Sequence, residues 1–141
     1  MEEYDNDYIS NMLGVLRPIL MIDNAKIWRE EEKIISQCAL NDSYSFWKYH
    51  FDNNPVMPGS YMVEMLAQTA AFLLMVITGC REVPIIVSVD KARFLREIKP
   101  NQLIEGVVFI KDTVGGYHTS KAKLICNGKT VCKAELVHYT K

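Results

Sequence analysis

The sequence predicts an α+β fold in which a curved antiparallel sheet wraps around one long central helix. Residues 60–78 form a nearly uninterrupted apolar stretch of helical length, with Ser60 as a candidate N-cap and Gly79 as a candidate C-cap. Apolar residues lie nearly all round this helix, so other elements must cover most of its sides. Strand-like segments separated by turn residues lie on both sides of it in the sequence and can supply that cover.

Six strands are predicted, two before the helix and four after it. They are expected at residues 19–28, 33–40, 84–95, 102–112, 117–126 and 129–139. Asn127-Gly128 is a strong signal for a two-residue hairpin, and the last three strands are expected to form an antiparallel meander. Unpaired edge strands favour edge-to-edge pairing in a homodimer. Residues 1–15 are expected to form a peripheral segment with a short helix that ends near Gly14.

Composition narrows the classes of protein to consider. A chain of 141 residues suits a single domain spanning residues 1–141, and its net charge of -1 gives no case for nucleic-acid binding. None of the four cysteines forms a C-x-x-C pair, so neither a zinc site nor a redox site is expected. In the predicted hairpin, Cys126 and Cys132 are expected to point to opposite faces of the sheet.

Two features favour a cytoplasmic protein without membrane insertion. The N-terminus is acidic rather than basic and apolar, which is unlike a secretory signal. The longest apolar run, residues 65–77, is too short to span a bilayer and contains Gln68 and Thr69. We therefore interpret this run as part of a buried core helix.

The stretch from His50 to Gly79 carries the candidate chemistry. His50 lies in a loop rich in proline and asparagine, and a Pro-Gly-Ser step then opens the apolar helix. Glu64 and Gln68 are the strongly polar side chains in the first half of the helix, and their spacing places them on one face. Burying a carboxyl and an amide on an apolar helix is costly without a partner or a purpose.

The motif His50-Phe51, Pro55-Val56-Met57-Pro58-Gly59, Glu64 and Ala67-Gln68 resembles the signature of β-hydroxyacyl-acyl-carrier-protein dehydratases, which have the hotdog fold. The spacing agrees throughout, and the resemblance covers nearly the whole chain beyond about residue 16. Tyr49 and Asp52 depart from the family pattern, which has glycine and proline there.

Dehydration of a β-hydroxyacyl thioester requires a base, a group that stabilises the developing enolate oxygen, and an acid for the leaving hydroxyl. His50 is the candidate base, since imidazole can accept a proton near neutral pH. The backbone N–H of Gly59 and of the first helical turn can form an oxyanion hole. Glu64 is the candidate acid, because burial should raise its pKa. Gln68 can hydrogen-bond to Glu64 and fix its rotamer.

The resemblance implies further roles. His50 of one subunit would face Glu64 of the other, which gives two composite sites in each dimer, with a trimer of dimers also open. The substrate would be linked through phosphopantetheine to an acidic acyl carrier protein in fatty-acid, related lipid or polyketide synthesis, with no metal or redox cofactor. The implied acyl-tunnel residues are Met62, Leu66 and Phe94, and the implied carrier contacts are Lys91, Arg93 and Arg96.

Two alternatives stay open. A hotdog thioesterase would use a carboxylate to activate water, and it usually lacks the His-Phe and Pro-Gly loop found here. A catalytically idle acyl-binding subunit is the other alternative, and the departures at Tyr49 and Asp52 motivate it.

Overall fold

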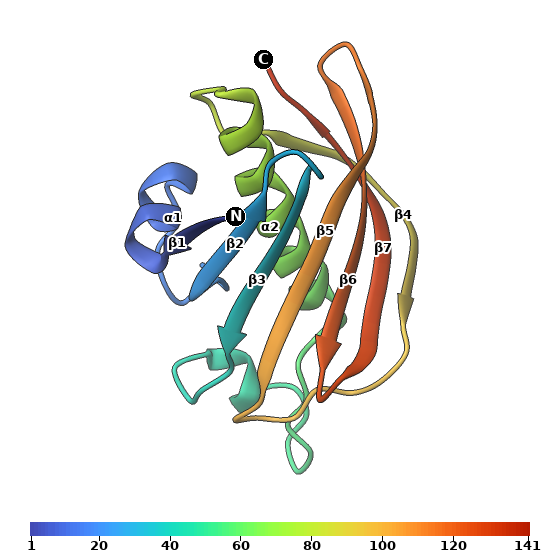
Figure 1. The fold of residues 1–141 in the computed structure, drawn as a ribbon. Helices are drawn as coiled ribbons and strands as arrows, with labels where there is room; N and C mark the ends of the chain where they lie inside the picture. Colours follow the sequence, from blue (N-terminus) through green and yellow to red (C-terminus); the bar gives the residue numbers. More distant parts are fainter.

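An antiparallel sheet of seven strands curls around helix α2 in the computed structural model, which describes all 141 residues (Figure 1). The fold predicted from the sequence is therefore confirmed. In chain order the elements are β1 (Glu2–Asp5), α1 (Asn6–Leu13), β2 (Asn24–Trp28), β3 (Lys33–Ala39), the 3₁₀ turn η1 (Ser45–Lys48), α2 (Gly59–Thr78), β4 (Ile85–Phe94), β5 (Leu103–Val114), β6 (Tyr117–Cys126) and β7 (Lys129–Tyr139).

The strand order across the sheet is β1-β2-β3-β5-β6-β7-β4. Strands β5, β6 and β7 form the predicted meander, and its two hairpins turn at Gly115-Gly116 and Asn127-Gly128. Asn127 and Gly128 both have positive φ (52° and 74°), which the twist of a two-residue hairpin requires. Strand β4, which follows α2, returns beside β7 and forms one edge of the sheet.

Helix α2 packs against the concave side of the sheet because its apolar residues extend nearly all round it. Its buried residues run from Met62 to Met75 and join the sheet residues in one core. One pair of hydroxyl groups is buried in this core, where Ser36 Oγ on β3 lies 2.8 Å from Thr69 Oγ1 on α2. Gly106 on β5 permits the close approach, since a Cβ there would lie 2.8 Å from Ser36 Oγ.

The N-terminal region contributes more to the fold than predicted. The short helix ends at Gly14 as expected, but β1 is an additional edge strand that pairs with β2. Helix α1 buries Ile9 and Leu13 completely or nearly so, and it packs beside α2. Residues 1–15 therefore cover one side of the central helix that the sheet leaves open.

The first predicted strand is too long at its start. Only Asn24–Trp28 is strand, whereas Leu20, Met21 and Ile22 are fully buried without sheet pairing. The backbone of this segment is instead bound by Gln68 of α2, whose Oε1 accepts from Met21 N at 2.9 Å and whose Nε2 donates to Ile19 O at 2.9 Å. The apolar side chains of this segment lie in the core, and the partner of its backbone is a helix rather than a strand.

The expectation that Cys126 and Cys132 point to opposite faces is wrong. A β-bulge in β7 makes Cys132 pair with Leu124 rather than with Lys123. Both cysteines are consequently buried on the core face, at 5% and 0% exposure, and both are free thiols.

Helix α2 is the one helix long and apolar enough to cross a membrane by those two criteria. Of its most apolar window, 61% is buried inside the protein. Its apolar surface is therefore accounted for by the core of the fold.

Candidate functional site

The loop that carries His50 is held in place by backbone hydrogen bonds on both sides of the residue. His50 N donates to Phe46 O at 3.0 Å, and Val56 N donates to His50 O at 2.7 Å. The ring Nδ1 lies 3.2 Å from Val56 O. Because a carbonyl oxygen can only accept, this contact places the proton of the neutral ring on Nδ1 and leaves Nε2 with the lone pair.

Aromatic side chains anchor the same loop to the start of α2. Phe46 is buried, and its ring lies 5.6 Å from that of Tyr44 and 5.0 Å from that of Tyr61 on α2. Tyr49 is 80% exposed with φ -117°, so this position needs no glycine and its side chain does not crowd the loop within the chain. At Asp52, where the family has proline, the turn is closed by paired hydrogen bonds between Phe51 and Asn54.

The N-terminus of α2 presents backbone amides without partners in the chain. The helix begins at Gly59 with Pro58 as the N-cap, two residues before the predicted cap, and Pro58 provides no side-chain hydrogen bond. Pro58 O accepts from Tyr61 N and Met62 N, whereas the N–H groups of Gly59 and Ser60 bind no acceptor. Such amides at the positive end of a helix dipole suit an anionic oxygen.

Phe94 covers Gly59 at this helix terminus. A Cβ built on Gly59 would lie only 2.9 Å from Phe94 Cε1, so the glycine allows the end of β4 to approach the helix. Met62 and Leu66, the other two predicted tunnel residues, are packed in the core at 3% and 0% exposure. Within one chain, Phe94 therefore lies beside Gly59 at the start of α2, whereas Met62 and Leu66 are buried in the core.

Glu64 lies one turn further along α2 and is half-buried. Burial raises the pKa of its carboxyl, and the nearby amide of Gln68 partly opposes this rise. Gln68 Oε1 accepts from Met21 N and Gln68 Nε2 donates to Ile19 O, which leaves the second N–H of Nε2 for the Glu64 carboxyl, so the hydrogen bond that would fix the Glu64 rotamer stays a prediction. Gln68 also fixes the chain segment that lies beside this face of the helix.

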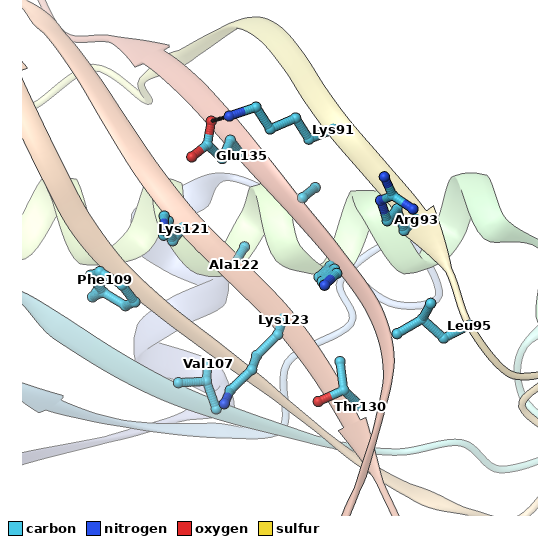
Figure 2. A pocket seen from close by; sticks show the side chains of 12 residues that line it. Lys91, Arg93, Leu95, Val107, Phe109, Lys121, Ala122, Lys123, Thr130 and Glu135 are labelled. Carbon is cyan, nitrogen blue, oxygen red and sulfur yellow. Dashed lines mark ion pairs between the residues drawn. The ribbon is translucent and has the colours of Figure 1, made fainter.

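The three predicted carrier contacts lie along the end of β4 and just beyond it. Lys91 Nζ lies 3.5 Å from Glu135 Oε2, and Arg96 Nη1 donates to Thr130 O at 3.0 Å. Arg93 projects onto the outer face of the sheet, where it lines a groove of about 590 Å³ (Figure 2). The sequence did not indicate this groove, because its lining comes from β4, β5, β6 and β7.

Comparison with known proteins shows which family this chain belongs to. A sequence model described as the FabA-like domain matches residues 15–135. The 3-hydroxyacyl-[acyl-carrier-protein] dehydratase FabZ of Janthinobacterium sp. (strain Marseille) is 30% identical, with 97% of this chain and 90% of the relative covered. The FabZ of Oenococcus oeni is 32% identical over 94% of this chain and 96% of the relative.

Solved structures with low identity share the fold. The dehydratase heterocomplex ApeI:P from Xenorhabdus doucetiae superposes with a TM-score of 0.74 at 11% identity, covering 94% of this chain and 90% of that one. A hypothetical thioesterase from Streptococcus pneumoniae TIGR4 gives 0.65 at 12% identity, covering 79% and 80%.

A curved antiparallel sheet wrapped around one long helix, together with the FabA-like match over residues 15–135, defines a protein of the hotdog fold. The chain belongs to the FabA-like family, and within it to the FabZ dehydratases. It is accordingly an enzyme of the hydro-lyase type.

Proposed function

We propose that this protein dehydrates a β-hydroxyacyl chain on acyl carrier protein to the trans-2-enoyl form. The observation that carries the proposal is the pair of unpartnered amides at Gly59 and Ser60, next to the loop of His50. A thioesterase has no comparable support, because the thioesterase structures that resemble this chain are under 25% identical and share only the fold. The FabZ relatives are 3-hydroxyacyl-[acyl-carrier-protein] dehydratases, which supports the β-hydroxyacyl substrate and its carrier.

Each step of the reaction has a candidate group in this chain. Nε2 of His50 takes the proton from the α-carbon of the substrate, and the electron pair moves into the thioester carbonyl. The amides of Gly59 and Ser60 bind the resulting enolate oxygen. As the enolate collapses to form the Cα–Cβ double bond, Glu64 protonates the β-hydroxyl, which leaves as water. His50 then carries one proton more and Glu64 one fewer, so a proton transfer through solvent or product restores both.

The raised pKa of Glu64 supports its role as the acid. A carboxyl must hold a proton at working pH to donate it, and burial on α2 favours that protonated form. The hydrogen bond from Nδ1 of His50 to Val56 O supports the complementary role, because it orients Nε2 as the free base.

The two groups are proposed to meet across a homodimer formed through β4. Within the chain β4 pairs only with β7, so its other edge carries free backbone N–H and C=O groups. This strand also exposes large apolar side chains at Ile85, Val87 and Phe94, with exposed fractions of 55%, 53% and 52%. A second β4 in antiparallel pairing would satisfy the backbone and cover those side chains.

The dimer is tested by placing a charge on the free edge. Val87→Lys should yield monomers in light scattering, because a lysine at an unpaired edge opposes strand pairing. Leu16→Lys is the matched control, since Leu16 is 75% exposed and lies outside the sheet. A Val87→Lys protein that keeps the mass of the wild type would contradict pairing through β4.

Activity is tested with a β-hydroxyacyl thioester and the wild-type protein. Formation of the enoyl product is followed by absorbance, and release of free thiol is measured in parallel. His50→Ala and Glu64→Gln should each lower kcat by at least about a hundredfold, since general acid–base groups contribute factors of that order. Glu31→Gln is the control for removal of an exposed carboxylate. Wild-type kcat in both site variants, or thiol release without enoyl product, would reject the proposal.

A further inference from the structure

The hydroxyl of Tyr44 is the centre of a buried set of hydrogen bonds. Arg17 Nη1 donates to Tyr44 Oη at 3.0 Å, and the hydroxyl itself donates to Leu20 O at 3.4 Å. Cys38 Sγ lies 3.1 Å from the same oxygen. Burial raises the pKa of both Tyr44 and Cys38, so each keeps its proton at neutral pH. A phenolic oxygen has one hydrogen and two lone pairs, so the thiol is left to donate and every site on the oxygen is used.

Arg17 is itself held in place by Asp23. Its Nη2 forms an ion pair with Asp23 Oδ1, while Asp23 Oδ2 accepts from Ala39 N at 2.6 Å. The backbone of Asp23 also donates to Gln37 O at 2.7 Å. The carboxylate therefore joins the segment before β2 to the end of β3, and it keeps the guanidinium directed at Tyr44.

The ring of Tyr44 stacks on Phe46, the residue that binds the backbone of His50. The two ring centroids lie 5.6 Å apart, with an angle of 21° between the planes. Phe46 O accepts from His50 N at 3.0 Å and from Tyr49 N at 3.2 Å. Because one residue separates the two contacts, a displacement of the tyrosine ring is passed directly to the backbone of His50.

Phe46 also contacts the first turn of α2, where the candidate oxyanion amides lie. Its ring lies 5.0 Å from that of Tyr61, whose N–H donates to Pro58 O at 3.0 Å. The segment before β2 is tied to the same helix, because Gln68 binds the backbone of residues 19–21. These contacts place the histidine loop and the start of α2 relative to each other.

We propose that Tyr44, held by Arg17, is the positioning residue for His50, an inference that rests on the proposed function. Its hydroxyl acts through Phe46 rather than on the substrate, and it fixes the direction in which Nε2 of His50 points. Proton abstraction requires the base within hydrogen-bond reach of the proton, and a displacement of about 1 Å can cost about a hundredfold in rate. Without the hydroxyl, Arg17 and Leu20 O lose their common partner and the stack is free to shift.

Tyr44→Phe tests this role, because it removes the hydroxyl and keeps the ring. With a β-hydroxyacyl thioester, kcat should fall about tenfold while KM stays within about twofold, since chemistry rather than binding depends on the direction of the imidazole. Tyr4→Phe is the matched control, because Tyr4 Oη donates to Glu2 at 2.7 Å and its ring contacts Phe72 in the second half of α2. Adding Tyr44→Phe to His50→Ala should cause no further fall, because both residues act on one step.

The ring of His50 gives a second readout that needs no substrate. In the wild type the proton of the neutral ring should lie on Nδ1, which faces Val56 O at 3.2 Å. Nitrogen NMR of protein with labelled histidines, recorded well above pH 7, distinguishes the two tautomers, and His50→Ala identifies the signals. In Tyr44→Phe these signals should move towards a mixture of tautomers, whereas in Tyr4→Phe they should not.

A purely stabilising role for the hydroxyl predicts a different outcome. A Tyr44→Phe protein with a lower thermal midpoint but wild-type kcat and unchanged His50 signals would overturn the inference, as would equal falls in kcat for Tyr44→Phe and Tyr4→Phe. If Tyr44→Phe does not fold, Arg17→Gln tests the same contact from a side chain that is 38% exposed, with the same changes expected. A wild type that dehydrates no β-hydroxyacyl thioester would instead refute the proposed function, and the His50 signals would still test the positioning.

Discussion

His138 makes the stability of this protein depend on pH between about 4 and 6.5. It faces the core from β7 at 1% exposure, opposite His118 on β6, and its Nδ1 has no hydrogen-bond partner. Burial lowers the pKa of His138 from 6.5 to about 4. A hydrogen bond with the backbone of Ala67 on α2 partly opposes this decrease in pKa, and the charge of His118 adds to the decrease. Burial also lowers the pKa of His118, partly offset by Glu32.

The sign and size of the effect follow from the two pKa values of His138. A histidine whose pKa is lower in the folded state binds more protons when unfolded, so its neutral form stabilises the fold above about pH 6.5. That stabilisation is lost as the pH falls towards 4. A shift from 6.5 to about 4 is worth about 3 kcal/mol in full, of which about 2 kcal/mol is lost between pH 7 and pH 5.

The perturbation is His138→Gln, and the assay is urea unfolding at a fixed protein concentration. Between pH 7 and pH 5 the free energy of unfolding of the wild type should fall by about 2 kcal/mol more than that of the variant. Between pH 7 and pH 9 the two proteins should change in parallel, because His138 is neutral in both states there. Equal losses in the acid range would refute the reasoning, since they would mean that His138 is not buried as a neutral ring.

Two further predictions concern the packing of α2. Gly106→Ala should lower the free energy of unfolding by about 1–3 kcal/mol, because the new Cβ would lie 2.8 Å from Ser36 Oγ. Chemical denaturation measures the loss. If adding Ser36→Ala to this variant restored none of the lost stability, the clash with Ser36 would not be its cause. Gln68→Leu should lower the free energy of unfolding by about 2–3 kcal/mol, since Met21 N and Ile19 O lose their partners. A neutral Gln68→Leu substitution in the same assay would show that water satisfies those groups.

The sequence predicts the parts of the fold that depend on local signals. Apolar residues lie nearly all round α2, which predicted that a sheet must cover it. Asn127-Gly128 predicted a hairpin that the structure contains. Strand β1 gave no such signal, because it has four mostly acidic residues and is held by pairing with β2. The bulge that turns Cys132 inward also arises from packing of β7 rather than from a local pattern.

The candidate site divides in a similar way. The candidate residues His50, Gly59 and Glu64 could be predicted from their spacing in the sequence, because one loop and the adjoining start of one helix carry all three. The contacts of Gln68 with the backbone could not be predicted in this way, since those partners lie 47 and 49 residues away.

Complementation between two inactive variants tests the central proposal most directly. His50→Ala and Glu64→Gln proteins are unfolded together, refolded as a mixture and assayed for dehydration. Random pairing makes half of the dimers mixed, and each mixed dimer joins one intact His50 to one intact Glu64 across the interface. If the site is shared between subunits, the mixture should recover about a quarter of the wild-type activity. A mixture that forms mixed dimers but stays as inactive as its two components would contradict a site shared between subunits.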